Sequence, residues 1–226
     1  MRQRHYPSIF LGIFLSMFFF LPAHINAATS DEEVIRNLEK TFAGIHALKA
    51  SFKQEADISV AGIERQEEST GVFYLKKPDK IKWVYEQPDK EILLLKNDLL
   101  FFYSEPDNQL LKRRITSLKD SANYLALLLN PDDSLLSSYS LENVEKKNEI
   151  FEAKLVPKGG EDNIKSLTLY IRAADFHLTG LSFRDNLENS TVITFQNMEI
   201  NPVIADDVFT LQVPDGTDIV DFNNDN

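Results

Sequence analysis

The sequence predicts a mainly β (α+β) protein, an incomplete antiparallel β-barrel of about 11 strands with a lid of two or three short helices. Runs with the two-residue period of β-strands recur through most of the chain, with turn residues between them. Connections this short join antiparallel neighbours. Helical spacing is confined to a segment before the first run and another near the middle of the chain. A long, twisted sheet tends to curl into a barrel or half-barrel.

The first 27 residues have the pattern of a secretory signal peptide. Arg2 and Arg4 precede an apolar run from Ile9 to Leu21, and small residues follow where a signal peptidase would cut, after Ala27. The run of about 13 residues is shorter than the roughly 20 that a membrane-spanning helix needs. We therefore expect an exported protein in which residues 28–226 form a single domain.

The composition argues against several classes of function. The chain has no cysteine, and therefore no lipid-attachable thiol, disulfide framework or thiolate ligand. Loss of Arg2 and Arg4 with the signal peptide changes the net charge from −11 to about −13, which repels nucleic acid and anionic lipid headgroups. The mature chain keeps only His46 and His177, and it has no catalytic or metal-binding motif. We expect no enzymatic activity, metal or cofactor, although carboxylates from distant strands can meet in ways that a sequence does not reveal.

An amphipathic helix is predicted over residues 31–49. Ser30 and Glu33 have the spacing of a capping box, in which each side chain binds the free backbone N–H of the other residue. Apolar residues then recur at helical spacing, at Val34, Leu38, Phe42, Ile45 and Leu48. One face of this helix must be buried against the rest of the protein.

Strands are predicted on both sides of a second helical segment. The helical segment covers 119–129 and ends at Asn130-Pro131, and one more helical turn is expected around 132–138. The tail from 221 to 226 is polar and is expected to fray. The predicted strands are 51–58, 67–76, 80–86, 90–96, 99–104, 109–115, 139–147, 149–156, 164–172, 178–184, 190–200 and 209–213.

One face of the predicted sheet carries many aromatic side chains. Ile81, Trp83 and Tyr85 share one parity within their run, and Phe101 and Tyr103 form a similar pair. Such a face either packs against other side chains in an ordinary barrel core or leaves a cavity for a bound ligand, the guest. The flanking amphipathic helices resemble a lid, and no polar constellation competes for the interior, so we favour the guest.

Several motifs, taken in order, resemble those of the outer-membrane lipoprotein carrier family, LolA. The resemblance extends over about 31–220 and includes a C-terminal stretch from Val208 to Pro214, followed by Gly216. The motifs nearer the N-terminus are Phe52-Lys53-Gln54, Gly71-Val72-Phe73-Tyr74-Leu75-Lys76-Lys77-Pro78, Lys82-Trp83-Val84-Tyr85 and Gln87-Pro88.

The resemblance implies a periplasmic carrier with an apolar cavity for the acyl chains of lipoproteins. Cargo would come from an inner-membrane LolCDE-type release complex and pass to an outer-membrane LolB-type acceptor, with no nucleic acid involved. We expect the carrier to be monomeric. The expected lining residues are Phe73, Leu75, Ile81, Trp83, Tyr85 and Phe101 from the sheet, with Leu125, Leu127 and Leu128 from the lid.

Lys77 departs from the family pattern. The family usually has arginine before this proline, and that arginine is understood to hold the lid helix closed. An ammonium is a compact point donor, whereas a guanidinium spans several acceptors in a plane, so the resemblance implies a weaker latch at Lys77. An ordinary turn lysine beside Pro78 is the other interpretation.

Two other functions remain open at the level of the sequence. A lipid- or lipoprotein-sensing periplasmic domain of similar half-barrel form is the main alternative, although such regulators usually have a second domain. A hydrolase of lipid esters is the third interpretation, and turnover of acyl esters would identify it.

Overall fold

The computed structural model describes residues 30–60, 63–115, 134–159 and 164–222. Its helices are α1 (Asp31–Ala43), α3 (Leu135–Ser138) and the 3-10 helix η2 (Asp206–Phe209). Its strands are β1 (Ala47–Val60), β2 (Ile63–Lys76), β3 (Lys80–Gln87), β4 (Glu91–Lys96), β5 (Leu99–Ser104), β6 (Gln109–Arg114), β7 (Tyr139–Lys147), β8 (Ile150–Pro157), β9 (Ile164–Arg172), β10 (Leu178–Asp185), β11 (Ser190–Ile200) and β12 (Asp218–Asp221).

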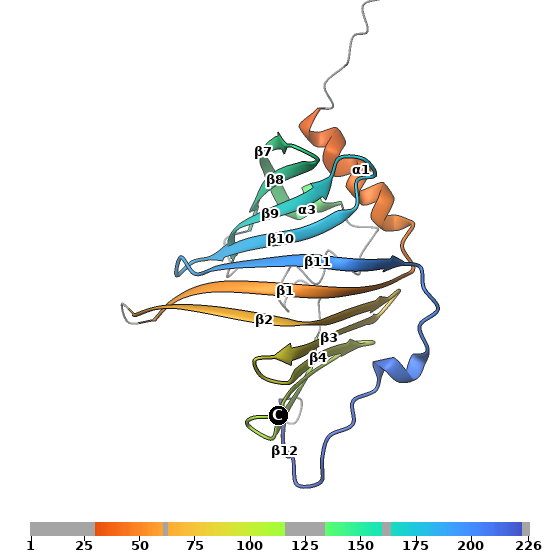
Figure 1. Ribbon diagram of the computed structural model, residues 1–226, viewed down its shortest axis with the longest axis vertical. Coiled ribbons are helices and arrows are strands. Elements are labelled where there is room, and N and C mark those ends of the chain that lie inside the picture. The colour runs from red at the N-terminus through yellow and green to blue at the C-terminus, as the bar shows by residue number, and fades with distance from the viewer. Residues whose placement is uncertain (1–29, 61–62, 116–133, 160–163, 223–226) are drawn as a thin grey trace, which may run out of the picture.

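Twelve strands form a single open sheet in the described part of the chain. Their order is β12-β6-β5-β4-β3-β2-β1-β11-β10-β9-β8-β7, and only the β6–β12 pair is parallel. The two edge strands do not pair with each other, so the sheet twists and curves without closing (Figure 1). The predicted incomplete antiparallel barrel is therefore confirmed, with one strand more than expected.

Helix α1 begins where the capping residues predicted. The Ser30 hydroxyl accepts a hydrogen bond of 3.3 Å from the backbone N–H of Glu33. The helix ends at Ala43, several residues before the predicted end at 49, because Gly44 caps it and Ala47 already pairs with Lys76 in the sheet. The helical spacing of the apolar residues gave the wrong end of the helix, since Leu48 belongs to β1 and faces the core from the sheet.

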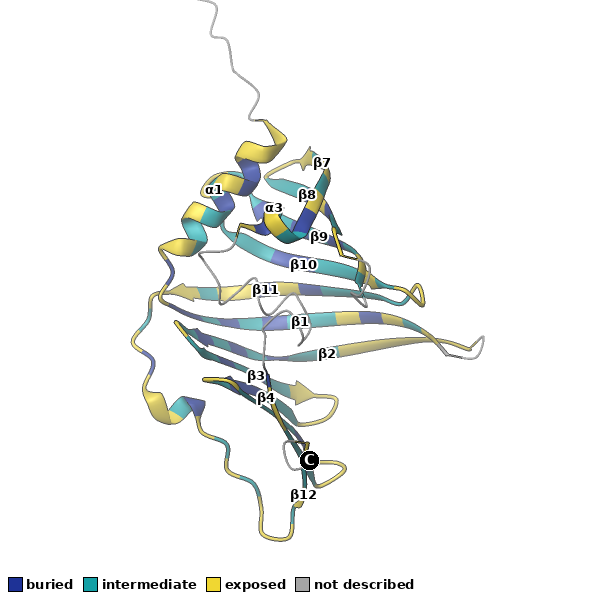
Figure 2. Cartoon of the chain, turned by 180° about the vertical axis from the view of Figure 1, so that it is seen from behind, coloured by how far each residue is buried: buried dark blue, intermediate teal, exposed yellow. Residues whose placement is uncertain are grey.

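Most predicted strands are present, but the central pair is longer than its sequence pattern. β1 and β2 have 14 residues each, and their outer halves extend past the end of β3 (Figure 1). The outer half of β2 is exposed on both faces, as its yellow colour in Figure 2 shows. In β2, burial is therefore confined to the inner half, where apolar residues alternate.

The pleat and register define two faces of the sheet. Phe73, Trp83 and Leu93 lie opposite one another on β2, β3 and β4 and form part of the main apolar core. Their neighbours Lys82 and Leu94 point to the other face. Helix α1 packs against β7 and β8 and shares the main core, so this side is the concave, covered one (Figure 2).

A connection of residues 201–217 crosses the convex face from β11 to β12. Phe209 is fully buried there in a second apolar cluster, and Lys82 and Lys96 donate side-chain hydrogen bonds to backbone carbonyls of this connection. The strand predicted at 209–213 is wrong, because a 3-10 helix ends at Phe209 and the stretch is held by lysine side chains rather than by a strand ladder.

Residues 221 and 222, at the start of the tail that was expected to fray, are ordered, whereas 223–226 lie outside the described residues. Asp221 belongs to β12, and the N–H of Phe222 donates to the Lys112 carbonyl at 3.0 Å. The predicted signal peptide and the helix at 119–129 lie outside the described residues. In the ranges that the structure describes, no helix is long and apolar enough to span a bilayer.

Candidate functional site

Four of the expected lining residues meet on the concave face. Phe73, Leu75 and Ile81 are completely buried and Trp83 is 2% exposed, all within one apolar cluster. Tyr85 lies half-buried on the same face, where its hydroxyl donates to Gln54 Oε1 at 3.2 Å. The three lid residues expected at Leu125, Leu127 and Leu128 lie outside the described part of the chain.

Phe101 does not lie on the concave face. It pairs with Leu94 of β4 and packs with Phe209 under the convex connection, so its assignment to the cavity lining is wrong. Every residue from Leu99 to Tyr103 is apolar, and such a run gives no parity from which to choose a face. The register with β4 instead turns Leu100 toward the main core.

Two aromatic residues of the lining were not predicted. The Phe52 ring lies 4.8 Å from the Trp83 ring, between centroids, in an edge-to-face arrangement. Phe195 lies 5.9 Å from Trp83 and 5.6 Å from Phe73. Phe52 and Phe195 are cross-strand partners on β1 and β11, and only the long-range register brings them to the same place.

The described cover of the concave face is helix α1 together with α3. Val34, Ile35 and Leu38 of α1 are buried in the same cluster as the sheet lining, as is Leu135 of α3. Glu39 ties the two helices together, since its Oε1 accepts hydrogen bonds from the Ser134 hydroxyl and the backbone N–H of Leu135. The contact between cover and sheet is apolar at its centre, and hydrogen bonds lie at its margins, from the Val144 N–H to Asp31 Oδ2 and from the Thr41 hydroxyl to the Asp175 carbonyl.

Lys77 binds the C-terminal end of α1. Its Nζ donates a hydrogen bond of 2.7 Å to the Phe42 carbonyl and lies 4.4 Å from the centroid of the Phe42 ring. A cation suits this place, because the last carbonyls of a helix carry partial negative charge. Burial lowers the pKa of Lys77, so the ammonium is held at some cost in hydration.

The junction between α1 and β1 is held by Asn201. Its Oδ1 accepts from the backbone N–H groups of His46 and Ala47, and its Nδ2 donates to the Gly44 carbonyl. These three bonds fix residues 44–47 to the end of β11. The C-terminal end of α1 is therefore fixed to the sheet.

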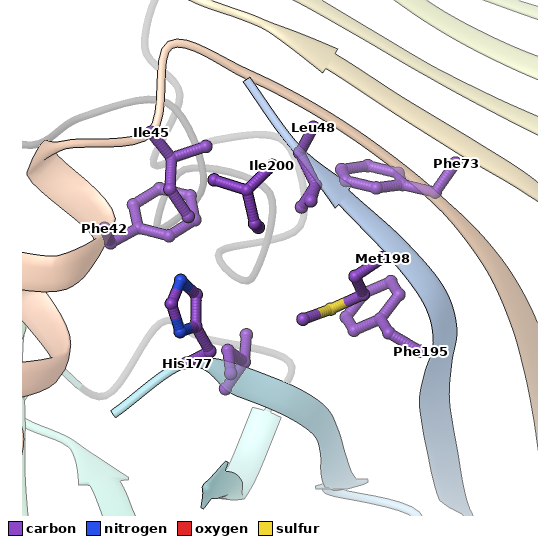
Figure 3. Close-up of a pocket in the computed structure, with 9 residues that line it drawn as sticks. Phe42, Ile45, Leu48, Phe73, His177, Phe195, Met198 and Ile200 are labelled. Atoms are coloured by element: carbon purple, nitrogen blue, oxygen red, sulfur yellow. The ribbon is translucent and has the colours of Figure 1, made fainter. Parts of the chain in front are cut away.

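A small apolar pocket opens at this end of α1. Figure 3 shows Phe42 and Ile45 on one side, with His177 below Phe42, and Phe73 and Phe195 on the other side. Its volume of about 20 Å³ has room for about one water molecule. Sites for drug-sized ligands have roughly 300–1,000 Å³, so an acyl chain does not fit this pocket as it stands.

Comparison with known proteins decides the family. The family model described as "Outer membrane lipoprotein carrier protein LolA" matches residues 43–212. This chain belongs to the LolA family. The match includes the buried lining, Lys77 and most of the convex connection.

Proteins of the family are similar in sequence to this chain over most of its length. An outer-membrane lipoprotein carrier protein from Cupriavidus taiwanensis is 26% identical over 205 residues, which is 88% of this chain and 90% of the relative. One from Methylococcus capsulatus is 27% identical over 172 residues, 76% of this chain and 80% of the relative. A crystal structure of an uncharacterized conserved protein from Thermus thermophilus has the same fold, with a TM-score of 0.52 at 14% identity, covering 84% of this chain and 98% of that one.

The polar groups around the LolA-type lining offer little for catalysis or metal binding. In the described ranges, no group of three or more His, Asp or Glu side chains is placed to hold a metal ion. His177 lines the small pocket, and its Nδ1 lies 3.0 Å from Asp175 Oδ2. What the LolA fold provides here is an apolar interior with a helical cover.

Proposed function

We propose that this protein is a periplasmic carrier that binds the acyl chains of lipoproteins released from the inner membrane. It receives them from a LolCDE-type release complex and delivers them to a LolB-type acceptor at the outer membrane, and it acts as a monomer. The family match and the names of the relatives support the carrier role.

The observation that carries the proposal is the pairing of a continuous apolar face with a separable cover. The sheet contributes Phe73, Leu75, Ile81 and Trp83, and α1 contributes buried apolar side chains to the same cluster. A few hydrogen bonds also join α1 to the sheet side, including one from Lys77 Nζ to the Phe42 carbonyl and one from the Val144 N–H to Asp31 Oδ2. A cover held in this way can move aside and leave the lining to a guest.

Hydrophobic energies explain why the cover matters. Each CH₂ group kept from water contributes about 0.8 kcal/mol, so acyl chains do not cross an aqueous compartment unsheltered. The same lining is buried by the protein's own residues when no cargo is bound. Displacing α1 uses part of the free energy that the guest supplies, which keeps binding strong enough for transport and weak enough for release.

The small size of the pocket beside Phe42 supports coupled opening rather than a preformed hole. At about 20 Å³ it marks a place where α1 and the sheet are already incompletely packed. We infer that opening widens this pocket and that acyl chains spread from there along the lining. Uptake and movement of α1 are then one event.

The proposal is tested by loss of the protein in a host that makes it. Depletion followed by membrane fractionation should leave outer-membrane lipoproteins in the inner-membrane fraction, and the purified carrier should contain acylated lipoprotein when it is co-expressed with a release complex. Normal lipoprotein sorting after depletion would contradict the proposal. Incubation with acyl esters separates it from the hydrolase alternative, since a carrier produces no free fatty acid.

A further inference from the structure

Among the described residues, the indole N–H of Trp83 has no hydrogen-bond partner. Trp83 is 2% exposed, and its Nε1 atom is buried with no acceptor within hydrogen-bond distance in the described ranges. Buried donors are nearly always paired, and an unpaired one opposes folding by an amount comparable to a lost hydrogen bond. A donor kept in this state needs an explanation.

Aromatic rings, rather than carbonyl oxygens, surround the Trp83 donor in the part of the chain that the structure describes. The rings of Phe52, Phe73 and Phe195 lie with centroids 4.8, 4.6 and 5.9 Å from the indole. Ring faces are weak acceptors compared with a carbonyl oxygen. The indole is thus held rigidly in an apolar cage with its N–H available.

The position of the indole is close to the pocket at the end of α1. Phe73 lines that pocket and is the cross-strand partner of Trp83. A guest that enters beside Phe42 and passes Phe73 therefore meets Trp83 next. The polar atom nearest the head of such a guest is the carbonyl through which each acyl chain is attached.

We propose that Trp83 Nε1 donates a hydrogen bond to an acyl ester carbonyl of the bound lipid, and so sets the depth at which the chains lie. This inference rests on the proposed function, because it assumes an acyl guest on the concave face. In the empty protein the donor is unpaired, and in the loaded one it is satisfied. The carrier then distinguishes acyl esters from hydrocarbon chains of equal length.

The test uses two fluorescein-labelled lipopeptides that differ only at the linkage. One has two ester-linked palmitoyl chains, and the other has two ether-linked hexadecyl chains, which lack the carbonyl oxygens. Affinities are measured by fluorescence anisotropy on the full mature chain. The proteins compared are wild type, Trp83→Phe, and protein in which tryptophan is replaced by benzothienylalanine.

The last protein is the matched control for packing. Trp83 is the single tryptophan of the chain, so biosynthetic replacement alters one site. Benzothienylalanine has nearly the same shape as tryptophan and no N–H donor. It keeps the test valid even if Trp83→Phe leaves a cavity that unfolds the protein.

Wild type should prefer the ester probe over the ether probe by about tenfold, the effect of one hydrogen bond to an otherwise unpaired donor. The preference should fall to near one in both variants, with affinity for the ether probe unchanged in the benzothienylalanine protein. The indole ¹⁵N–¹H signal should also shift downfield with the ester probe alone.

An equal preference in all three proteins would overturn the role of Trp83 and leave the carrier function standing. Failure of both probes to bind wild type would count against the carrier function itself. The proposed hydrogen bond from Trp83 would then be contradicted as well. The two failures are therefore distinguishable in one set of titrations.

Discussion

Lys77 Nζ lies 2.7 Å from the Phe42 carbonyl oxygen and 4.4 Å from the centroid of the Phe42 ring. One side chain at the end of β2 thus binds both the backbone and the side chain at the end of α1. Phe42 also lines the pocket beside the helix. One of the contacts that hold the cover is therefore located where a guest would enter.

Lys77→Met should loosen α1 without unfolding the sheet. A hydrogen bond of this kind contributes about 1 kcal/mol, so the open population should rise about fivefold. The Phe42 carbonyl keeps its backbone donor, the Ile45 N–H at 3.1 Å, which limits the loss. Amide hydrogen exchange over Asp31–Ala43 measures the change, with binding of an apolar dye as a second readout.

Lys158→Met is the matched control for this substitution. Lys158 Nζ donates to the Leu136 carbonyl of α3 at 2.6 Å, but it is exposed and lies away from the end of α1. Its loss should raise exchange in α1 far less than Lys77→Met does, because α3 reaches α1 through Glu39 and not at Phe42. Equal exchange in the Lys77→Met and wild-type proteins would show that Lys77 does not hold the cover.

Phe209→Ala should destabilise the fold strongly. Phe209 is fully buried between the convex connection and the sheet, and loss of such a side chain costs about 3–5 kcal/mol. Val203→Ala on the same connection serves as control, because Val203 is fully exposed and its loss should change stability by less than about 0.5 kcal/mol. Urea unfolding of both variants measures the difference, and similar midpoints would contradict the placement of Phe209.

Asp206 should make the convex connection sensitive to acid. Hydrogen bonds from Lys76 and Lys80 lower the pKa of Asp206 to about 2 from 3.8. An acid whose pKa is lower in the folded state contributes stability that is complete above pH 3.8 and is lost as the pH falls toward 2.

The stability difference between wild type and Asp206→Asn should therefore shrink between pH 5 and pH 2. Urea unfolding at several pH values measures it, with Asp215→Asn on the same connection as the control. A difference that stays constant over this range would show that the two lysines do not stabilise the Asp206 carboxylate.

Gly71→Ala should be far more harmful than Gly159→Ala. A Cβ at Gly71 would clash with the Val84 carbonyl of β3, because the sheet has an irregularity between Thr70 and Gly71. At Gly159 nothing lies within 4 Å of an added Cβ. We expect a loss of at least about 2 kcal/mol at Gly71 and almost none at Gly159, measured by thermal unfolding. Equal melting temperatures would mean that β2 and β3 separate easily at this point.

The sequence predicted the fold where its pattern has one interpretation. Ile81 and Trp83 alternate with Lys80 and Lys82, and all four lie on the faces that this alternation indicates. The cap at Ser30 likewise fixed the start of α1. In both places local chemistry and tertiary structure agree.

The features that the sequence did not predict depend on contacts between residues that are distant in the chain. Phe101 sits in a run that is apolar at every position, so only pairing with β4 assigns its face. Phe195 joins Trp83 because β11 lies beside β1, although these strands are far apart in the sequence. The conformation of residues 209 and 210 depends on Lys82 of β3 and Lys96 of β4, whose side chains donate hydrogen bonds to their carbonyls.

Photo-crosslinking from Phe73 and Phe101 tests the central claim most directly. These phenylalanines lie on opposite faces of the sheet, in the main core and the convex cluster. Benzoylphenylalanine at each position, in carrier co-expressed with a release complex, should yield a lipoprotein adduct from position 73 and none from position 101. Adducts of equal yield from both positions, or from 101 alone, would contradict an acyl-binding concave face.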